Sequence, residues 1–372
     1  MANERLPLIL FTKGGGASEP ERWVGGACRA NTLDLVARAA SLPEIGPIVL
    51  VTAPDDWDVP LSGLPVELVV DEPGLPFHFG RRLRDVVARF GLTRFLYMGG
   101  GAGPLLGAQE MGQVARRALA MERGVLANNL YSADWVAVSP ASALDAIELP
   151  ETDNDLAWRL AAAGLPAEGL PPGAATRLDI DTPNDLLIAS LHPACGPALR
   201  DYVNGLPLDR ERVSRILAEL ANPRGQVLAY GRVSSATWAA LERLPCQTRI
   251  FSEERGMRAS GRQARGQVHA WLGSYLQAVG PQAFFGALAR SCTAALVDTR
   301  VLFAHLGLHP SAADRFYSDL LLPGQVSDPH VRALTEAALA APVPLMLGGQ
   351  GLVSGDLLAL AEVAKRPAPS QA

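Results

Sequence analysis

Cysteine is scarce in this chain, and its spacing argues against two kinds of site. The 372 residues contain four cysteines, Cys28, Cys195, Cys246 and Cys292, which lie far apart without a CxxC pair. Zinc sites and redox motifs depend on closely paired cysteines. We therefore interpret all four as free thiols in a reducing cytoplasm, which argues against a disulfide-bonded or zinc-binding module.

Lysine and long apolar runs are also missing. Lys occurs only at Lys13 and Lys365, so arginine carries nearly all the positive charge, and the net charge is −5 with a pI near 5.7. This acidic balance argues against nucleic acid or a membrane surface as the main partner. The apolar run ending at Phe11 is too short to span a bilayer and lacks a signal-peptide layout. The histidines show no metal-ligand spacing beyond a weak pair, His305 and His309.

What the chain does contain is an alternation of short apolar runs and helical patterns, which occurs twice. A length of 372 residues exceeds one average domain, and 48% hydrophobic residues suffice for packed cores. Strand–helix alternation is typical of βαβ sheets. We predict an α/β chain in which residues 1–195 form a domain with a GT-A- or Rossmann-like, mostly parallel sheet. Residues 196–224 form a helical connector, residues 225–365 a second α/β domain, and residues 366–372 a disordered tail.

A run of three aspartates at residues 179–185 is the most informative motif. We expect an extended segment over residues 176–180, then a turn, then a helix from Leu186 that Thr182 caps. Asp179 and Asp181 point the same way from an extended backbone, because side chains alternate with period two. Two such carboxylates suit Mg²⁺ that is shared with substrate phosphates. A helix cap with solvated aspartates explains the pattern about equally well.

The order Asp-x-Asp-Thr-Pro-x-Asp-Leu near the end of an α/β domain resembles the nucleotidyltransferases of the molybdenum-cofactor and phospholactate guanylyltransferase type. The resemblance covers roughly residues 5 to 195. It implies a GT-A-like fold and a late aspartate motif that holds a divalent metal on the nucleotide. Under this resemblance Asp179 and Asp181 are the metal ligands, Mg²⁺ is the cofactor, and Asp181 and Arg22 are the catalytic residues.

Two glycine clusters follow predicted strands in this half. Gly14, Gly15 and Gly16 allow backbone N–H groups to approach a phosphate, with Arg22 as a source of positive charge; a flexible surface loop is the alternative. Gly99, Gly100 and Gly101 precede Pro104-Leu105, where the family places Gly-Asp-x-Pro-Leu with a metal-binding Asp. We find glycine in place of that carboxylate near Gly100. Three explanations stay open: Asp179 and Asp181 suffice, Asp134 substitutes, or the domain has lost the transfer activity.

Polar loops follow the predicted strands of the second half. Ligands bind at the carboxyl ends of strands in open α/β sheets. We therefore predict an anion or phosphate site there, with structural salt bridges as the alternative. Its candidate residues are Arg232, Ser234, Arg255, Arg258, Arg300, Gly348 and Gly349.

The sequence motifs and the resemblance best support an enzyme that transfers NMP from an NTP to a small phosphorylated acceptor with release of pyrophosphate. Its partners are an NTP or nucleotide-sugar and a phosphorylated small molecule. A non-catalytic nucleotide- or sugar-phosphate-binding protein on the same fold is the alternative. A third interpretation places the chemistry in the second domain.

Overall fold

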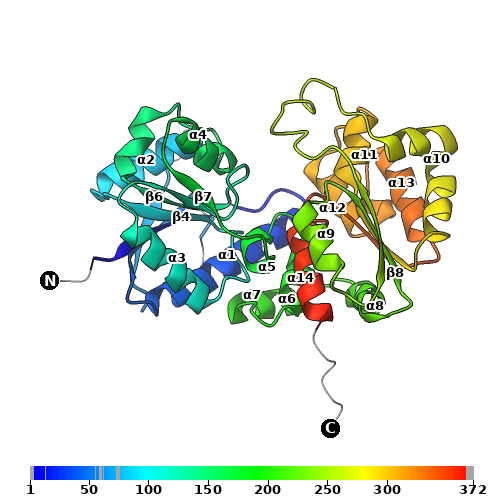
Figure 1. The fold of residues 1–372 in the computed structure, drawn as a ribbon, viewed down its shortest axis with the longest axis horizontal. Coiled ribbons are helices and arrows are strands. Elements are labelled where there is room, and N and C mark those ends of the chain that lie inside the picture. Colours follow the sequence, from blue (N-terminus) through cyan, green and yellow to red (C-terminus); the bar gives the residue numbers. More distant parts are fainter. Residues whose placement is uncertain are drawn as a thin grey trace, which may run out of the picture. The chain divides into compact units, whose positions relative to one another are not determined.

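The computed structural model describes residues 4–12, 14–54, 56–57, 61, 63–72 and 76–365. They fall into two compact units, each with its own sheet (Figure 1). The first unit comprises residues 1–15, 25–180 and 194–202, and the second comprises 16–24, 181–193 and 203–372. The predicted disordered tail, residues 366–372, lies outside the described residues.

A seven-stranded sheet forms the centre of the first unit, in the order β3-β2-β1-β4-β6-β5-β7. Strand β6 runs antiparallel to both its neighbours, β4 and β5, and the other neighbouring pairs are parallel. This confirms the predicted α/β fold with a mostly parallel sheet. The strands are β1 (Leu6–Phe11), β2 (Ile45–Thr52), β3 (Val66–Val70), β4 (Phe95–Gly99), β5 (Gly124–Ala127), β6 (Trp135–Ser139) and β7 (Ala167–Gly169).

Helices cover both faces of this sheet (Figure 1). Along β1, Ile9 and Phe11 pack with α2 and α4, whereas Leu8 and Leu10 pack with α1 and α3. Because side chains alternate between the two faces of the strand, β1 contributes to two separate apolar layers. The helices are α1 (Glu19–Ala40), α2 (Phe79–Arg89), α3 (Ala108–Ala120), α4 (Leu156–Ala162), α5 (Ala174–Arg177) and α7 (Pro197–Asn204), with the 3₁₀ turns η1 (Ala141–Ala146) and η2 (Asp153–Asp155).

The second unit is built on a four-stranded sheet in the order β11-β10-β8-β9, and all its neighbouring strands are parallel. The strands are β8 (Gln226–Gly231), β9 (Gln247–Ser252), β10 (Ala294–Asp298) and β11 (Leu345–Gly348). The helices are α6 (Pro183–Leu191), α8 (Arg210–Ala221), α9 (Ser235–Leu241), α10 (Trp271–Ala289), α11 (Thr299–His305), α12 (Ala312–Asp319), α13 (Pro329–Leu339) and α14 (Gly355–Ala364), with the 3₁₀ turn η3 (Pro323–Gln325).

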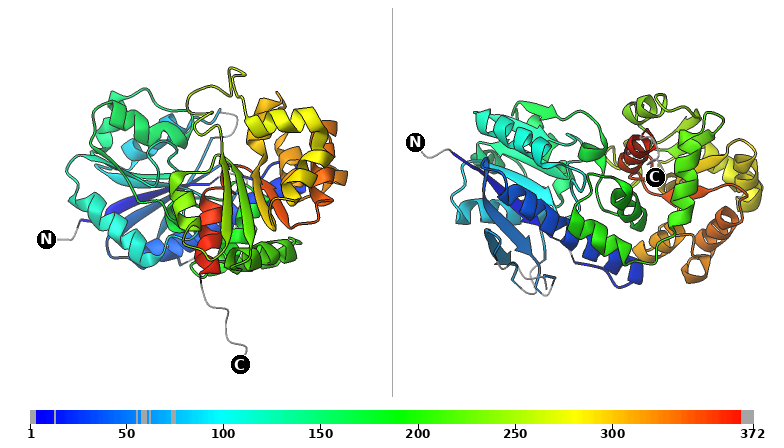
Figure 2. Two further views of the ribbon diagram at one scale, coloured as in Figure 1. Left: turned by 45° about the vertical axis from the view of Figure 1, so that its right-hand side comes forward. Right: turned by 90° about the horizontal axis from the view of Figure 1, so that it is seen from below.

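Two helical layers also sandwich this smaller sheet. Helices α10, α11 and α13 share one apolar core with Leu228, Tyr230 and Val297 of the strands. On the other face, helix α14 contacts both α8 and α9. The yellow and orange helices and the red α14 accordingly lie on opposite sides of the green strands (Figure 2). The second predicted α/β sheet is therefore confirmed.

Local predictions were wrong in three places. Only part of the predicted extended segment 176–180 is extended, because the one-turn helix α5 (Ala174–Arg177) takes its first two residues, whereas Leu178 is extended and Asp179 forms a β-bridge. Strand β6 begins at Trp135, so Asp134 precedes the strand and does not lie inside it. The short strands β5 and β7, with four and three residues, were not predicted at all. Runs of this length are too short to show a period, and tertiary pairing decides their conformation.

Candidate functional site

The carboxyl ends of β1 and β4 bring the two glycine clusters of the first unit to one edge of the sheet. The strands are parallel neighbours, with Phe11 paired to Gly99. Just beyond that pair, the Gly100 N–H donates a hydrogen bond to the Phe11 carbonyl at 2.8 Å. The loop that starts at Gly14 and the turn at Gly99–Gly101 therefore leave the sheet side by side.

The aspartate motif joins the same edge through an isolated antiparallel bridge between Ala102 and Asp179. The Ile180 N–H donates to the Gly101 carbonyl at 3.0 Å. A Cβ at Gly101 would lie only 2.7 Å from the Ile180 carbonyl oxygen and 3.1 Å from Asp179 Oδ1. Glycine at position 101 is thus required by the close approach of the aspartate segment.

The metal-binding carboxylate that the family resemblance implies is absent here, and the position it would take needs correction. Counting back from Pro104, the Asp of Gly-Asp-x-Pro-Leu falls on Ala102 and not on Gly100. Ala102 is fully buried and pairs across the bridge with Asp179, so their side chains are neighbours. A Cβ at Gly100 would instead lie 3.2 Å from Thr32 Oγ1 and 3.3 Å from the Phe11 carbonyl oxygen. Position 100 therefore faces packed protein, and Ala102 is where a second carboxylate would meet Asp179.

The phenol of Tyr97 is hydrogen-bonded to one aspartate at this edge, and the charges of two more act on it. The Tyr97 hydroxyl donates to Asp153 Oδ2 at 2.9 Å. Burial raises the pKa of Tyr97 well above its usual value, and the negative charges of Asp153, Asp179 and Asp134 raise it further. The first unit thus concentrates carboxylates beside its glycine turns. Asp134 and Asp179 were candidates from the sequence, whereas Asp153 was not among the predicted site residues.

Asn128 ties this cluster together. Its Nδ2 donates to Asp134 Oδ2 at 2.7 Å and to the Thr176 carbonyl at 3.2 Å, and its Oδ1 accepts the Asp134 N–H at 3.1 Å. Its carbonyl accepts a bond from Arg177 Nη1 at 2.7 Å. Asn128 follows β5 and not a helix, so it holds the β5–β6 hairpin against the segment that leads into Asp179. This side chain orients the acidic cluster.

The first glycine loop has close packing partners of its own. A Cβ at Gly25 of α1 would lie 2.6 Å from the Gly15 Cα and N atoms, so loop and helix touch backbone to backbone. A side chain at Gly14 would collide with the Asp56 carboxylate. The glycines therefore have a packing role, whether or not their N–H groups also hold phosphate. Lys13 lies outside the described residues.

The remaining predicted residues of this group belong to the second unit. Gly16 is exposed there, and the exposed Arg22 side chain donates through Nη1 to the Ala17 carbonyl. The compact units divide between Ile180 and Asp181, so Asp179 is a residue of the first and Asp181 of the second. The shared metal site of these two carboxylates stays a prediction.

The start of α6 confirms the predicted capping of the aspartate motif. Thr182 is the N-cap and Pro183 the first helical residue, and the side chains of Thr182 and Asp185 form a capping box. Asp185 Oδ2 accepts the N–H groups of Thr182 and Asp181, the latter at 2.8 Å. One of the three aspartates of the motif thus has a structural role, while the exposed Asp181 side chain is not part of the capping box.

Among the described residues, no group of three or more His, Cys, Asp or Glu side chains could hold a metal ion. A divalent cation at the first edge would therefore need oxygen ligands from a substrate, as Mg²⁺ commonly does. Asp179, with the charges of Asp134 and Asp153 nearby, fits such a partial ligand set.

The second sheet also brings its predicted loops together, since all four strands are parallel and their carboxyl ends share one edge. Arg232, after β8, forms a buried ion pair with Asp298 at the end of β10, with Nε–Oδ2 at 2.6 Å and Nη2–Oδ1 at 3.1 Å. Arg300 holds Asp319 through both Nη atoms, at 2.9 and 2.5 Å. These two arginines thus serve structural ion pairs, which was the alternative interpretation.

The other members of the predicted anion site differ in their contacts. Ser234 caps α9 by accepting the Thr237 N–H at 3.1 Å. Gly348 ends β11, and Gly349 lies beside Arg300, since a Cβ there would be 3.8 Å from the arginine Cγ and Nε. Arg255 and Arg258 are exposed in the loop after β9.

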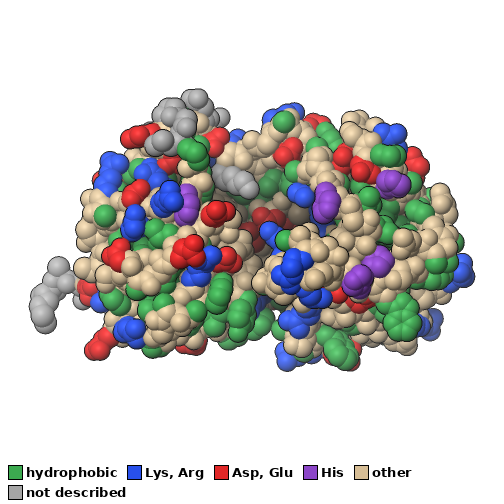
Figure 3. Space-filling model, turned by 90° about the horizontal axis from the view of Figure 1, so that it is seen from above, with side chains coloured by type: hydrophobic (Ala, Val, Ile, Leu, Met, Phe, Trp, Pro, Cys, Tyr) green, Lys and Arg blue, Asp and Glu red, His purple; other side chains and the backbone are tan. Residues whose placement is uncertain are grey.

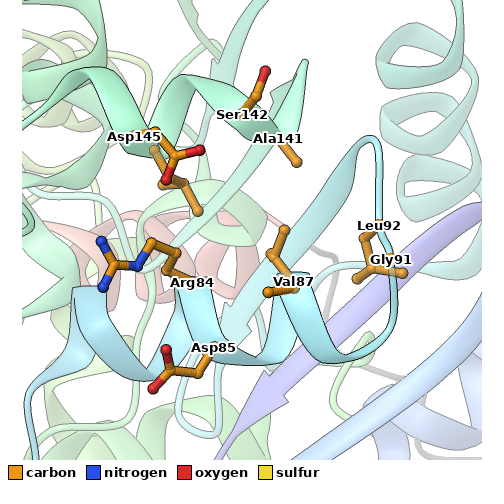
Figure 4. A pocket seen from close by; sticks show the side chains of 10 residues that line it. Arg84, Asp85, Val87, Gly91, Leu92, Ala141, Ser142 and Asp145 are labelled. Carbon is orange, nitrogen blue, oxygen red and sulfur yellow. The ribbon is translucent and has the colours of Figure 1, made fainter.

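A surface hollow of about 330 Å³ lies elsewhere on the first unit, between α2 and η1 (Figure 4). Arg84 and Asp85 approach it from α2, and Ser142 and Asp145 from η1. It adjoins Leu92, just before β4, so it sits at the amino end of β4, opposite the glycine turns. We therefore do not assign it as the functional site, because α/β sheets bind ligands at carboxyl ends.

Among the described residues, no helix is long and apolar enough to cross a membrane. No protein-family model matches the sequence, and no curated protein is significantly similar to it.

Several solved structures share part of the fold. A protein of Desulfovibrio desulfuricans G20 described as a nucleotide-diphospho-sugar transferase aligns over 45% of this chain and 80% of its own, at 15% identity and a TM-score of 0.34. A cytidylyltransferase of Leptospira borgpetersenii aligns over 54% and 93%, at 12% identity and a TM-score of 0.40. A protein of Mycobacterium tuberculosis H37Rv aligns over 50% and 96%, at 20% identity and a TM-score of 0.36. Similarities at this level identify neither a family nor a substrate.

Proposed function

We propose that the first unit is a nucleotidyltransferase-like domain that acts on a nucleoside triphosphate. The observation that carries this proposal is the bridge between Ala102 and Asp179, which seats the aspartate motif on the edge where β1 and β4 end. A carboxylate beside glycine turns at the carboxyl edge of a sheet is suited to a metal-bound phosphate chain.

The reaction is transfer of a nucleoside monophosphate to a small phosphorylated acceptor. An acceptor phosphate oxygen forms a bond to the α-phosphorus, and the bond from that phosphorus to the bridging oxygen breaks, so that pyrophosphate leaves with the electron pair. Such transfer depends on positioning and charge neutralisation more than on covalent chemistry by the protein.

The residues of this chain have separate roles in the proposal. The backbone of Gly14, Gly15 and Gly99–Gly101 leaves room for phosphates, since these positions carry no Cβ. Asp179 would hold a divalent cation, which when bound neutralises phosphate charge. Asn128 and Tyr97 orient Asp134 and Asp153 around it. Asp181 as second ligand and Arg22 as a positive charge stay predictions from the sequence.

A non-catalytic nucleotide- or sugar-phosphate-binding protein is the second candidate, and Ala102 favours it. This fully buried methyl group stands where a carboxylate would join Asp179. With fewer protein ligands, Mg²⁺ binding depends more on the phosphates. A binding protein would retain nucleotide affinity with little Mg²⁺ dependence.

The decisive experiment measures pyrophosphate release and nucleotide binding in parallel. Purified full-length protein is incubated with each NTP, Mg²⁺ and a panel of phosphorylated acceptors, and pyrophosphate is quantified. Asp179→Asn should lower the rate by about a hundredfold, the effect of losing a strong electrostatic contact. Asp145→Asn, at the opposite edge of the sheet, is the matched control and should leave the rate unchanged.

Calorimetric titration with NTP, with and without Mg²⁺, separates the two candidates. Mg²⁺-dependent binding that Asp179→Asn abolishes, together with pyrophosphate release, supports the transferase. Tight, Mg²⁺-independent binding without turnover over the whole acceptor panel would leave only the binding protein. If neither NTP nor nucleotide-sugar binds, both candidates fail.

A further inference from the structure

Helix α12 of the second unit carries Arg315, which the sequence places among the polar groups near the predicted anion site but outside its set of candidate residues. Arg315 and Asp319 lie four residues apart on α12, so their side chains share one face of the helix. Asp319 is fully buried and is held by both Nη atoms of Arg300. Arg315 is therefore placed next to the Arg300–Asp319 pair at the carboxyl edge of β10 and β11.

The guanidinium of Arg315 makes no hydrogen bond or ion pair among the residues that the structure describes. Burial lowers the pKa of its guanidinium, and the positive charges of Arg300 and Arg258 lower it further. Asp319 and Glu21 oppose this with negative charge. However, Glu21 is bound to the Ser18 N–H at 3.0 Å and the Ser18 hydroxyl at 2.6 Å, and Asp319 is occupied by Arg300.

Arg258 reaches this neighbourhood from the loop between β9 and α10. Met257, beside it, is fully buried in the apolar core of the second unit and anchors the loop there. Arg258 itself is exposed, and its guanidinium also makes no hydrogen bond or ion pair among the described residues. Other arginines of this loop are engaged, since Arg262 pairs with Glu254 and Arg265 donates to the Ser260 carbonyl. Lys and Arg side chains are drawn in blue on the second unit (right-hand half of Figure 3).

The charges of these groups do not cancel. Arg258, Arg300 and Arg315 contribute three positive charges against the carboxylates of Asp319 and Glu21. Guanidinium groups that repel one another and have few protein partners are stabilised by a bound anion. The glycine backbone at Gly349 next to Arg300 leaves open space there, because no side chain fills it.

We propose that Arg258 and Arg315, positioned by the Arg300–Asp319 pair, form a binding site for a phosphate group of a small molecule on the second unit. The site lies at the edge where parallel α/β sheets bind ligands. Its membership differs from the sequence prediction, because Arg232 and Ser234 have structural partners and Arg315 takes their place. Inorganic phosphate and a phosphate monoester share the recognised chemistry, and the site binds a phosphate from either source.

The test is calorimetric titration of full-length protein with inorganic phosphate and with glycerol phosphate in dilute chloride buffer. Arg315→Gln should weaken the binding of both by about tenfold or more, the loss expected for a charge-assisted hydrogen bond. Arg258→Gln should weaken it several-fold, and since this residue is exposed, its replacement does not endanger folding. The control is Arg290→Gln, an exposed arginine that precedes the amino end of β10.

Unchanged phosphate affinity in both Arg315→Gln and Arg258→Gln would overturn the proposal. An equal loss in Arg290→Gln would overturn it as well, because the effect would then be one of net charge. Selective loss in the two site variants, with monoester bound more tightly than inorganic phosphate, would support it and indicate an organic phosphate as the ligand.

Discussion

At the carboxyl edge of the first sheet, three aspartates act with their charge on the Tyr97 phenol. At the carboxyl edge of the second sheet, Arg232 and Arg300 form ion pairs with buried aspartates. Both edges end parallel strands and both carry glycine turns. The first edge gathers carboxylates, which suit a cation and its phosphates, and the second edge carries arginines, which suit an anion. Under the two proposals, the sheet topology sets the place of binding, and the side chains that follow the strands set the ligand.

Breaking the charge balance of the second edge should have the largest effect. Arg232→Ala leaves the fully buried Asp298 without its guanidinium, which costs about 3 to 5 kcal/mol of unfolding free energy. Hydrogen exchange measured by mass spectrometry should show faster exchange in β8 and β10, while β1 and β4 are unchanged. Arg290→Ala is the matched control. Equal exchange in β8 and β10 of Arg232→Ala and the parent would show that the pair is not needed.

A pair of buried carboxyls sharpens the comparison between the two edges. Asp356 lies at the start of α14 and Asp185 in the first turn of α6. Asp356 and Asp185 are both buried, and burial raises the pKa of each, with the partner's negative charge raising that of Asp185 further. The folded state thus binds protons more tightly than the unfolded chain, whose Asp pKa is about 3.9. Stability from this pair is complete below the unfolded pKa and is lost as pH rises through the raised folded pKa, which for Asp356 is about 6.

Asp356→Asn should therefore stabilise the protein at pH 7.5, by on the order of 2 kcal/mol, and should flatten the fall in stability between pH 4 and 7. Thermal unfolding at several pH values measures both effects. Glu336→Gln, at an exposed position of α13, is the control and should keep the parent's slope. An Asp356→Asn protein that is less stable at pH 7.5 would contradict the interpretation that the buried charged carboxyl destabilises the folded state.

At the first edge, Tyr97→Phe removes the hydroxyl that donates to Asp153. The carboxylate then loses a buried donor, which should cost about 1 to 2 kcal/mol of unfolding free energy. Denaturant unfolding at pH 7 gives the value, and hydrogen exchange in β4 assigns it to the first unit. Phe79→Leu, in the same aromatic cluster, controls for loss of packing alone. If Tyr97→Phe proves neutral, the hydroxyl does not hold Asp153.

The smallest effect concerns Ser234, which we now assign to capping and not to anion binding. Ser234→Ala removes the cap of α9 and should cost about 1 kcal/mol of unfolding free energy. The same variant should bind phosphate as tightly as the parent in the calorimetric titration. Ser234→Asn, which retains a capping oxygen, should restore stability. Weaker phosphate binding in Ser234→Ala would show that Ser234 also contributes to the anion site.

The sequence predicted the elements whose patterns are local. Strand β1 ends at Phe11, as the apolar run in the sequence does, and Thr182 caps α6 as expected, because apolar runs and capping residues act within a few positions. Long-range pairs could not be read in this way. The bridge from Ala102 to Asp179 and the ion pair from Arg232 to Asp298 join distant segments, and one sequence does not show which charges are buried together.

For two further site residues, Asp153 and Arg315, the local sequence pattern does not indicate a site. Asp153 opens an acidic run before α4, which also fits an ordinary helix start. Arg315 and Asp319 have the four-residue spacing of a helical pair, yet only the contact with Arg300 gives that spacing a meaning. The position of the absent carboxylate follows from counting back from Pro104, and only the bridge at Ala102 shows that this position adjoins Asp179.

The reversed direction of β6 has a consequence for the order in which the first edge assembles. Because β5 and β6 form an antiparallel hairpin, Asn128 and Asp134 lie close along the chain and can meet within microseconds. The bridge to Asp179 must instead close a long loop, and its entropic cost delays such contacts. We expect the hairpin half of the cluster to be protected early in refolding and the Ala102–Asp179 bridge late. Pulsed hydrogen exchange measures this order. Simultaneous protection of the Asp134 and Ile180 amides would contradict it.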